Sequence, residues 1–119
     1  MDVISMLQAA VGLFAIAAAG GLVMAGIRLL GRRNPPAWLS MLHGLLAAAG
    51  VTLVAYAAVL GGVPTPGGWA LFLFIVAAAG GAAMNLLWQW RQRPLPVGLM
   101  LGHATLAVIG FLLLCVAAF

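Results

Sequence analysis

The residues of this sequence best suited to chemistry are its two histidines, His43 and His103, which lie 60 residues apart. The sequence repeats with the same spacing: aligned without a gap, residues 11–59 and 71–119 are identical at 18 of 49 positions. A chain so rich in Ala, Leu and Gly would match by chance at about one position in eight. A rare ionisable residue at the same place in both halves therefore indicates one site, built from two equivalent helices.

The composition predicts that these helices lie in a membrane. Hydrophobic residues make up 66% of the chain and charged residues 5%, which is more apolar surface than a small soluble domain can bury. A helix needs about 20 apolar residues to cross a bilayer. Four stretches meet this length, at about 5–30, 38–60, 69–90 and 97–118. We therefore expect residues 1–119 to form a single all-α transmembrane domain in contact with the lipid bilayer.

The repeat predicts how the four helices are arranged. Each half, about 5–60 and about 69–119, contains one helical hairpin, so we interpret the bundle as a tandem duplication of that hairpin. Two helices are an even number, so both halves enter the membrane in the same orientation, and the predicted pseudo-twofold axis runs along the membrane normal. Such an axis places the second and fourth helices opposite each other. The identical residues of these helices, histidines included, follow one helical stripe, so both histidines are expected to point into the bundle.

Positive charge is confined to the ends of the first and third predicted helices, at Arg28, Arg32, Arg33, Arg91 and Arg93. By the positive-inside rule, both short arginine loops are expected in the cytoplasm and both termini outside, as in a bacterial inner membrane. A DNA-binding protein instead spreads its basic residues over one face of a soluble fold. The net charge of +4 therefore does not predict nucleic-acid binding.

Residue counting places the histidines about 10 Å below the arginine end of the bundle. An ionisable residue at such a depth is a functional candidate, and the chain holds no Glu or Lys, and a single Asp near its N-terminus. Two imidazoles across a twofold axis suit a haem iron, whose two axial nitrogens lie about 4 Å apart. The sequence thus predicts one b-type haem, with His43 and His103 as its axial metal ligands.

A porphyrin requires small residues around it and a positive group for its propionates. Gly20, Gly80, Gly50 and Gly110 remove side chains near the expected depth, so we expect them to line the cofactor. Arg28, at the arginine end of the first helix, is a candidate partner of a propionate, as are Arg32 and Arg93.

This pattern resembles the four-helix core of cytochrome b from the quinol-oxidising respiratory complexes. In that family, histidines on the second and fourth helices ligate haem, and glycines on the first and third make room for it. His43, His103, Gly20 and Gly80 stand at the matching places. The resemblance implies electron transport by a membrane cytochrome, with a quinone or a redox protein as partner.

The resemblance does not extend to the second haem of that family, which needs another histidine on each helix about four turns further along. Those places hold Tyr56 or Ala57 in one half and Val116 or Ala117 in the other. We therefore expect at most one haem. Since both axial positions would be filled by the protein, such a haem transfers electrons and does not activate oxygen at the iron.

Two other interpretations remain open from the sequence. The histidines could bind copper together with Met24 and Met84, since imidazole and thioether ligands suit Cu(I), which would indicate metal transport or delivery. Alternatively, they could be packing residues of a small accessory or assembly protein. Cys115 lies about 18 Å along the helix from His103 and belongs to neither site. No acid–base or nucleophilic set argues for hydrolysis, and the sequence leaves open whether the protein is an enzyme.

Overall fold

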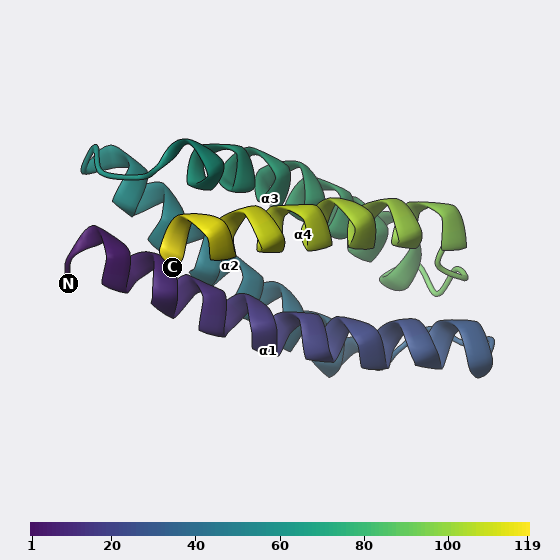
Figure 1. Ribbon diagram of the computed structural model, residues 1–119. Helices are drawn as coiled ribbons and strands as arrows, with labels where there is room; N and C mark the ends of the chain where they lie inside the picture. Colours follow the sequence, from purple (N-terminus) through teal and green to yellow (C-terminus); the bar gives the residue numbers. More distant parts are fainter.

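A computed structural model describes all 119 residues of the chain, and every regular element in it is helical (Figure 1). The helices are α1 (Val3–Leu30), α2 (Ala37–Val59), α3 (Thr65–Met84) and α4 (Val97–Ala118), and a π-helical turn, η1 (Asn85–Gln89), continues α3. Each of the four is long and apolar enough to cross a membrane. The predicted all-α transmembrane four-helix bundle is confirmed, and the chain has the character of an integral membrane protein.

The helix ends follow from local sequence. Asp2 caps α1, because its carboxylate accepts hydrogen bonds from the backbone N–H and the hydroxyl of Ser5, each at 2.9 Å, and these bonds lower the pKa of Asp2. Pro36 and Pro96 directly precede α2 and α4. The start of α3 differs from the predicted position near residue 69: the helix begins at Thr65, because a proline fits the first turn of a helix.

The sequence did not predict the π-helical turn at the end of α3. There the backbone N–H of Trp90 bonds to the carbonyl of Asn85 at 2.8 Å, five residues back. The equivalent part of α1 stays α-helical to Leu30. The two halves therefore differ where α3 reaches the arginine loops, and π turns of this kind are often found at functional sites.

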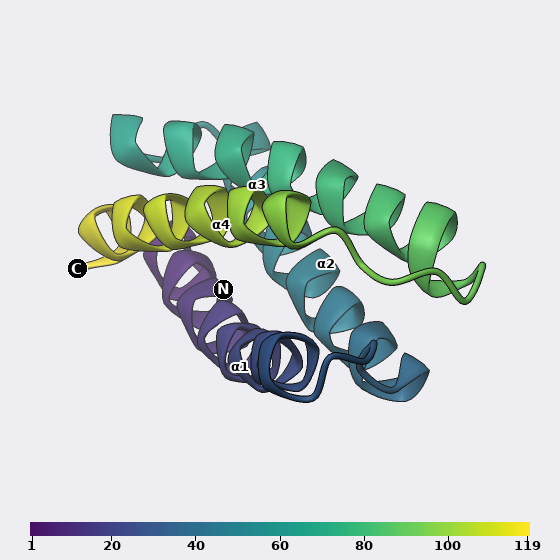
Figure 2. The same cartoon turned by 90° about the vertical axis from the view of Figure 1, so that its right-hand side faces the viewer.

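The chain forms two helical hairpins, α1–α2 and α3–α4, that pack side by side (Figures 1 and 2). Both termini lie at one end of the bundle. The two loops that follow α1 and η1 lie at the other end, which we call the arginine end because all five arginines are there. Within each hairpin the helices pack along most of their length, and between hairpins α1 contacts α4 and α2 contacts α3.

Tight packing is concentrated at the end that holds the termini. We call the buried cluster there the terminal core; its members are Met6, Leu7, Ala10, Phe14, Val54, Ala57, Ala70, Phe74, Leu114, Ala117 and Ala118. Phe14 and Phe74 join the hairpins by stacking face to face, with ring centroids 3.8 Å apart and planes 7° from parallel. At the arginine end, Pro35 and Met84 are the only buried residues of segments 20–40 and 80–100.

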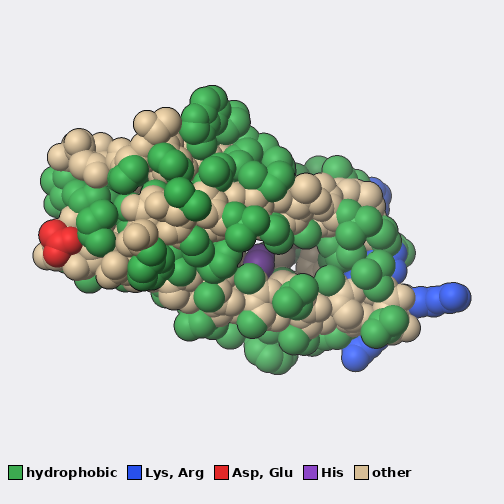
Figure 3. Space-filling view, viewed as in Figure 1, with side chains coloured by type: hydrophobic (Ala, Val, Ile, Leu, Met, Phe, Trp, Pro, Cys, Tyr) green, Lys and Arg blue, Asp and Glu red, His purple; other side chains and the backbone are tan.

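Less packing at the arginine end leaves the bundle hollow there. Figure 3 shows an opening between the two hairpins, with a histidine at its inner edge and the arginines beyond it. The terminal core holds the hairpins together on one side of this opening. The histidines therefore lie where the packed part of the bundle gives way to the hollow part.

Gly50 should be required for the terminal core. A Cβ at Gly50 would lie 2.8 Å from Cε2 of Phe14, whose ring cannot move freely because it is stacked on Phe74. Gly50→Ala should therefore lower the free energy of unfolding by about 1–3 kcal/mol, the usual effect of overpacking. Gly44→Ala, on the same helix with nothing within 4 Å of its Cβ, is the matched control and should not destabilise the fold. Unfolding in mixed detergent micelles measures the stability of both variants. Equal destabilisation by Gly50→Ala and Gly44→Ala would contradict close packing of Gly50 against Phe14.

Candidate functional site

The structure brings His43 of α2 and His103 of α4 together between the hairpins. Their ring centroids are 6.0 Å apart and the ring planes meet at 62°. Imidazoles on opposite sides of one metal, each at a metal–nitrogen distance of about 2 Å, place their ring centres about 6 Å apart. The separation of the two rings is compatible with a single metal ion between them, and it also lies in the range of a direct edge-to-face ring contact.

Both imidazoles are held in the same way by the neighbouring helix. His43 Nδ1 lies 2.8 Å from the carbonyl oxygen of Ala17, and His103 Nδ1 lies 2.8 Å from that of Ala77. Because a carbonyl oxygen only accepts hydrogen bonds, Nδ1 must carry the proton in each ring. Each Nε2 then keeps a free lone pair, and neither has a hydrogen-bond partner in the protein. Histidines that ligate metals are usually oriented by such a bond from their other nitrogen.

Glycines of α1 and α3 face the two rings. A Cβ at Gly21 would lie 3.3 Å from Cε1 of His43, and one at Gly81 would lie 3.2 Å from Cε1 of His103. These glycines let each imidazole lie close against the neighbouring helix, within reach of the carbonyl that orients it. The same contact occurs in both halves of the chain, 60 residues apart.

The four glycines predicted to line a cofactor do not contact the imidazoles. A Cβ at Gly20 or Gly80 would have no neighbour within 4 Å, so neither residue packs against the imidazoles. Gly50 and Gly110 are buried against Phe14 and Phe74, where they make room for the stacked rings of the terminal core. The residues in contact with the imidazoles are therefore Gly21 and Gly81, which directly follow Gly20 and Gly80 and were not predicted.

The histidine pair has few other candidate ligands around it. Met24 was predicted near the level of His43, but its sulfur accepts a hydrogen bond from Ser40 Oγ at 3.5 Å, one turn nearer the arginine end. Nowhere in the chain do three or more His, Cys, Asp or Glu side chains gather in a metal-binding arrangement. Cys115 is free and lies on the same helix as His103, near the terminal core. The site thus offers two imidazole nitrogens.

Hydrogen bonds tie the hairpins together at the arginine end, beyond the hollow. Asn34 Nδ2 donates to the carbonyl of Arg93 at 2.7 Å, and Asn34 Oδ1 accepts from the backbone N–H of Leu95 at 2.9 Å. Arg28 Nε donates to the carbonyl of Leu95 at 2.9 Å. A further bond runs from Gln89 Nε2 to the carbonyl of Pro35 at 2.7 Å. We call these three side chains, Arg28, Asn34 and Gln89, the clasp.

The clasp residues are present in only one of the two halves of the repeat. The positions equivalent to its three side chains hold Trp88, Pro94 and Leu29, which cannot make the same bonds. Each clasp bond crosses from one hairpin to the other, so the hairpins are joined by apolar packing at one end and by polar bonds at the other. The hollow and the histidine pair lie between these two joints.

Removing Asn34 should loosen the arginine end. Asn34→Ala deletes two inter-hairpin hydrogen bonds and should lower the free energy of unfolding by about 1–2 kcal/mol. The distribution of distances between spin labels placed on the two arginine loops should also become broader and shift to longer distances. Gln92→Ala is the matched control, because Gln92 is exposed at the same end and its side chain makes no hydrogen bond. If both variants behave like the native chain, the clasp does not hold the hairpins.

Comparison with protein-family models, with curated proteins and with solved structures gave no match. The function of the chain therefore rests on the site itself: two imidazoles in a membrane bundle, oriented by backbone carbonyls, 6.0 Å apart between ring centroids and next to an opening between the hairpins.

Proposed function

We propose that the protein is a membrane-embedded electron carrier that holds one b-type haem between His43 and His103. The observation that supports this most strongly is the geometry of the pair. Both Nδ1 atoms bond to backbone carbonyls, both Nε2 atoms are without a hydrogen-bond partner, and the ring centroids are 6.0 Å apart, a separation that one shared iron can span.

The surroundings of the pair fit this cofactor. The hollow beside the histidines lies between the hairpins, and Gly21 and Gly81 let the two imidazoles lie close against α1 and α3. Arg28 lies at the arginine end of the hollow and uses only Nε for its bond to Leu95, so its terminal nitrogens are available to a propionate. A bare Cu(I) ion would need only the two nitrogens and gives no reason for the hollow.

The protein would supply both axial ligands and tune them. When bound, the haem supplies a one-electron iron couple. The bonds from Nδ1 to the Ala17 and Ala77 carbonyls increase the electron-donating power of the imidazoles. Because no coordination position is left for a substrate, the partner would exchange electrons at the edge of the cofactor, and a quinone or a redox protein fits that role.

We further propose that the bundle arose by tandem duplication of a helical hairpin and lies in a bacterial inner membrane, with the arginine loops in the cytoplasm and both termini outside. The support for duplication is that the histidine–carbonyl bonds, the glycine–imidazole contacts and the phenylalanine–glycine contacts each recur 60 residues later. The support for the orientation is the confinement of all five arginines to one end.

The visible spectrum of the purified protein tests the proposed function. The chain should be produced in haem-sufficient cells, purified in detergent, and measured oxidised and after reduction with dithionite. We expect about one haem per chain and the sharp reduced α-band of a six-coordinate b-type haem. Apoprotein titrated with haemin should reach the same spectrum.

Two other results would overturn the proposal. A colourless protein that contains copper by elemental analysis would instead establish a metal-handling site at the same histidines. A colourless and metal-free protein that also fails to bind added haemin would leave the histidines a structural role in an accessory protein.

A further inference from the structure

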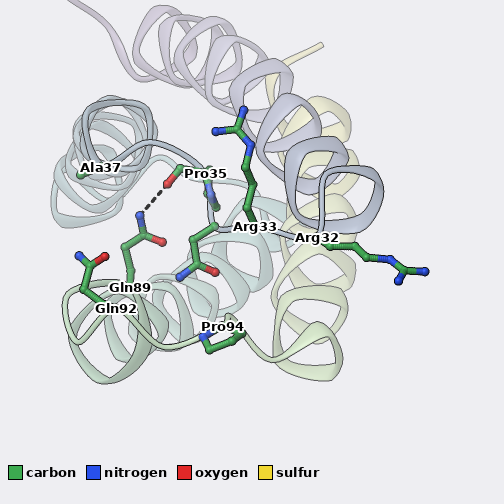
Figure 4. A pocket seen from close by; sticks show the side chains of 8 residues that line it. Arg32, Arg33, Pro35, Ala37, Gln89, Gln92 and Pro94 are labelled. Atoms are coloured by element: carbon green, nitrogen blue, oxygen red, sulfur yellow. Dashed lines mark hydrogen bonds between the residues drawn. The ribbon is translucent and has the colours of Figure 1, made fainter.

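The arginine end contains a polar pocket that the proposed haem site does not use (Figure 4). Its volume is about 390 Å³, and both hairpins contribute to its wall. The polar residues that line it are Arg32, Arg33, Asn34, Gln89 and Gln92. A pocket of this polarity at the end of membrane-spanning helices lies where lipid headgroups are found, and the exposed Trp38 and Trp90 near it are typical of that depth.

The charge of this pocket has no counter-ion in the protein. The only acidic side chain of the chain, Asp2, caps α1 at the opposite end of the bundle. Arg32 and Arg33 are exposed, and Arg28 is the only arginine whose side chain donates a hydrogen bond to the protein. In Figure 4 the guanidinium groups of Arg32 and Arg33 extend away from the pocket. Since nothing holds them there, both can turn inwards towards an anion.

The start of α2 adds hydrogen-bond donors to the same wall. Ala37, the first residue of α2, lines the pocket, and Pro36 before it provides no side-chain cap. The first two backbone N–H groups of the helix are therefore left without a partner, at the end of the helix where the dipole is positive. Together with Arg32 and Arg33, they favour a phosphate group.

Gln89 adds an acceptor that needs a donor. Its Nε2 bonds to the carbonyl of Pro35, but its Oε1 is enclosed and has no hydrogen-bond partner. Figure 4 shows this oxygen turned towards the pocket. A buried acceptor without a partner is unfavourable, so a ligand hydroxyl that reached this oxygen and donated to it would be favoured.

We propose that this pocket binds the headgroup of an anionic phospholipid that carries a free hydroxyl, of the phosphatidylglycerol type. The phosphate lies between Arg32, Arg33 and the start of α2, and a headgroup hydroxyl donates to Gln89 Oε1. Basic pockets at the ends of membrane helices are suited to such lipids. The proposal does not depend on haem, because neither histidine nor Arg28 lines this pocket.

Native mass spectrometry of the detergent-purified chain tests the proposal. The probes are phosphatidylglycerol, phosphatidic acid, phosphatidylcholine, glycerol phosphate and inorganic phosphate, each titrated separately. We expect phosphatidylglycerol to bind with one-to-one stoichiometry, about tenfold tighter than phosphatidic acid and tighter still than phosphatidylcholine. Glycerol phosphate and inorganic phosphate should bind more weakly than the lipid, because they lack its acyl chains.

Matched variants separate the pocket from general charge. The pair Arg32→Gln and Arg33→Gln should weaken phosphatidylglycerol binding at least about tenfold. Arg91→Gln, which removes a charge at the same end but outside the pocket, should not. Gln92→Glu adds a negative charge to the wall without removing an arginine and should also weaken binding. Equal losses in Arg91→Gln, equal affinity for phosphatidylcholine, or tighter binding of the soluble phosphates than of the lipid would overturn the proposal.

Discussion

Replacing either His43 or His103 with alanine should abolish six-coordinate haem binding. Each imidazole is expected to supply one of the two axial bonds, and the chain has no third histidine to take the place of either. The haem content of the purified protein should fall from about one per chain to below about one in ten. Haem content is measured by the pyridine haemochrome assay, and the fold is checked by circular dichroism.

Two comparisons make this result specific. Met24→Ala should keep its haem, whereas a copper site built with methionine would lose its metal. Glycine in place of His43 opens a space for free imidazole, and adding imidazole to His43→Gly should restore the low-spin spectrum. If His43→Ala and His103→Ala retain the native spectrum, the histidine pair is not the haem site.

Adding a methyl group at both Gly21 and Gly81 should weaken haem binding about tenfold to a hundredfold, although neither glycine is a ligand. Each new Cβ would lie within 3.3 Å of an imidazole carbon, tighter than ordinary van der Waals contact. The rings must then move by a few tenths of an ångström or turn away from the carbonyls of Ala17 and Ala77. Either change disturbs both axial bonds at once. Haemin titration of the apoprotein measures the effect.

The adjacent glycines provide a matched control for this double variant. Alanine at Gly20 and Gly80 faces open space, so haem affinity should stay within about twofold of the native value. Because alanine favours helix over glycine, the same control should raise the free energy of unfolding by up to about 1 kcal/mol per site. If the two double variants lose haem to the same degree, close contact with Gly21 and Gly81 does not position the rings.

The fold and the pairing of the histidines could be predicted because both depend on periodic patterns. Four apolar stretches of sufficient length predict four membrane helices, and a helical stripe predicts which face of a helix turns inwards. His43 and His103 lie on such stripes at equivalent places, so any parallel arrangement of the two hairpins brings them near each other. Neither prediction depends on the angles at which the helices cross.

The details of the site could not be predicted because they depend on the crossing of the helices. Neighbouring residues on a helix point in directions about 100° apart. The rotation of α1 about its own axis therefore decides whether Gly20 or Gly21 faces His43. The sequence could not predict that the neighbouring carbonyls orient the rings, since every helical residue carries one. The clasp was not predicted because Arg28, Asn34 and Gln89 have no equivalent residue in the other half of the repeat. A search for polar residues present in only one half would have found all three.

The measurement that tests the central claim most directly is electron paramagnetic resonance of the oxidised protein, made with histidine labelled with ¹⁵N. If His43 and His103 are both axial ligands, the ferric protein should give a single low-spin signal, and its nitrogen couplings should come from two labelled imidazoles. A high-spin ferric signal, or a coupling to only one labelled imidazole, would contradict the proposal that the two histidines share one iron.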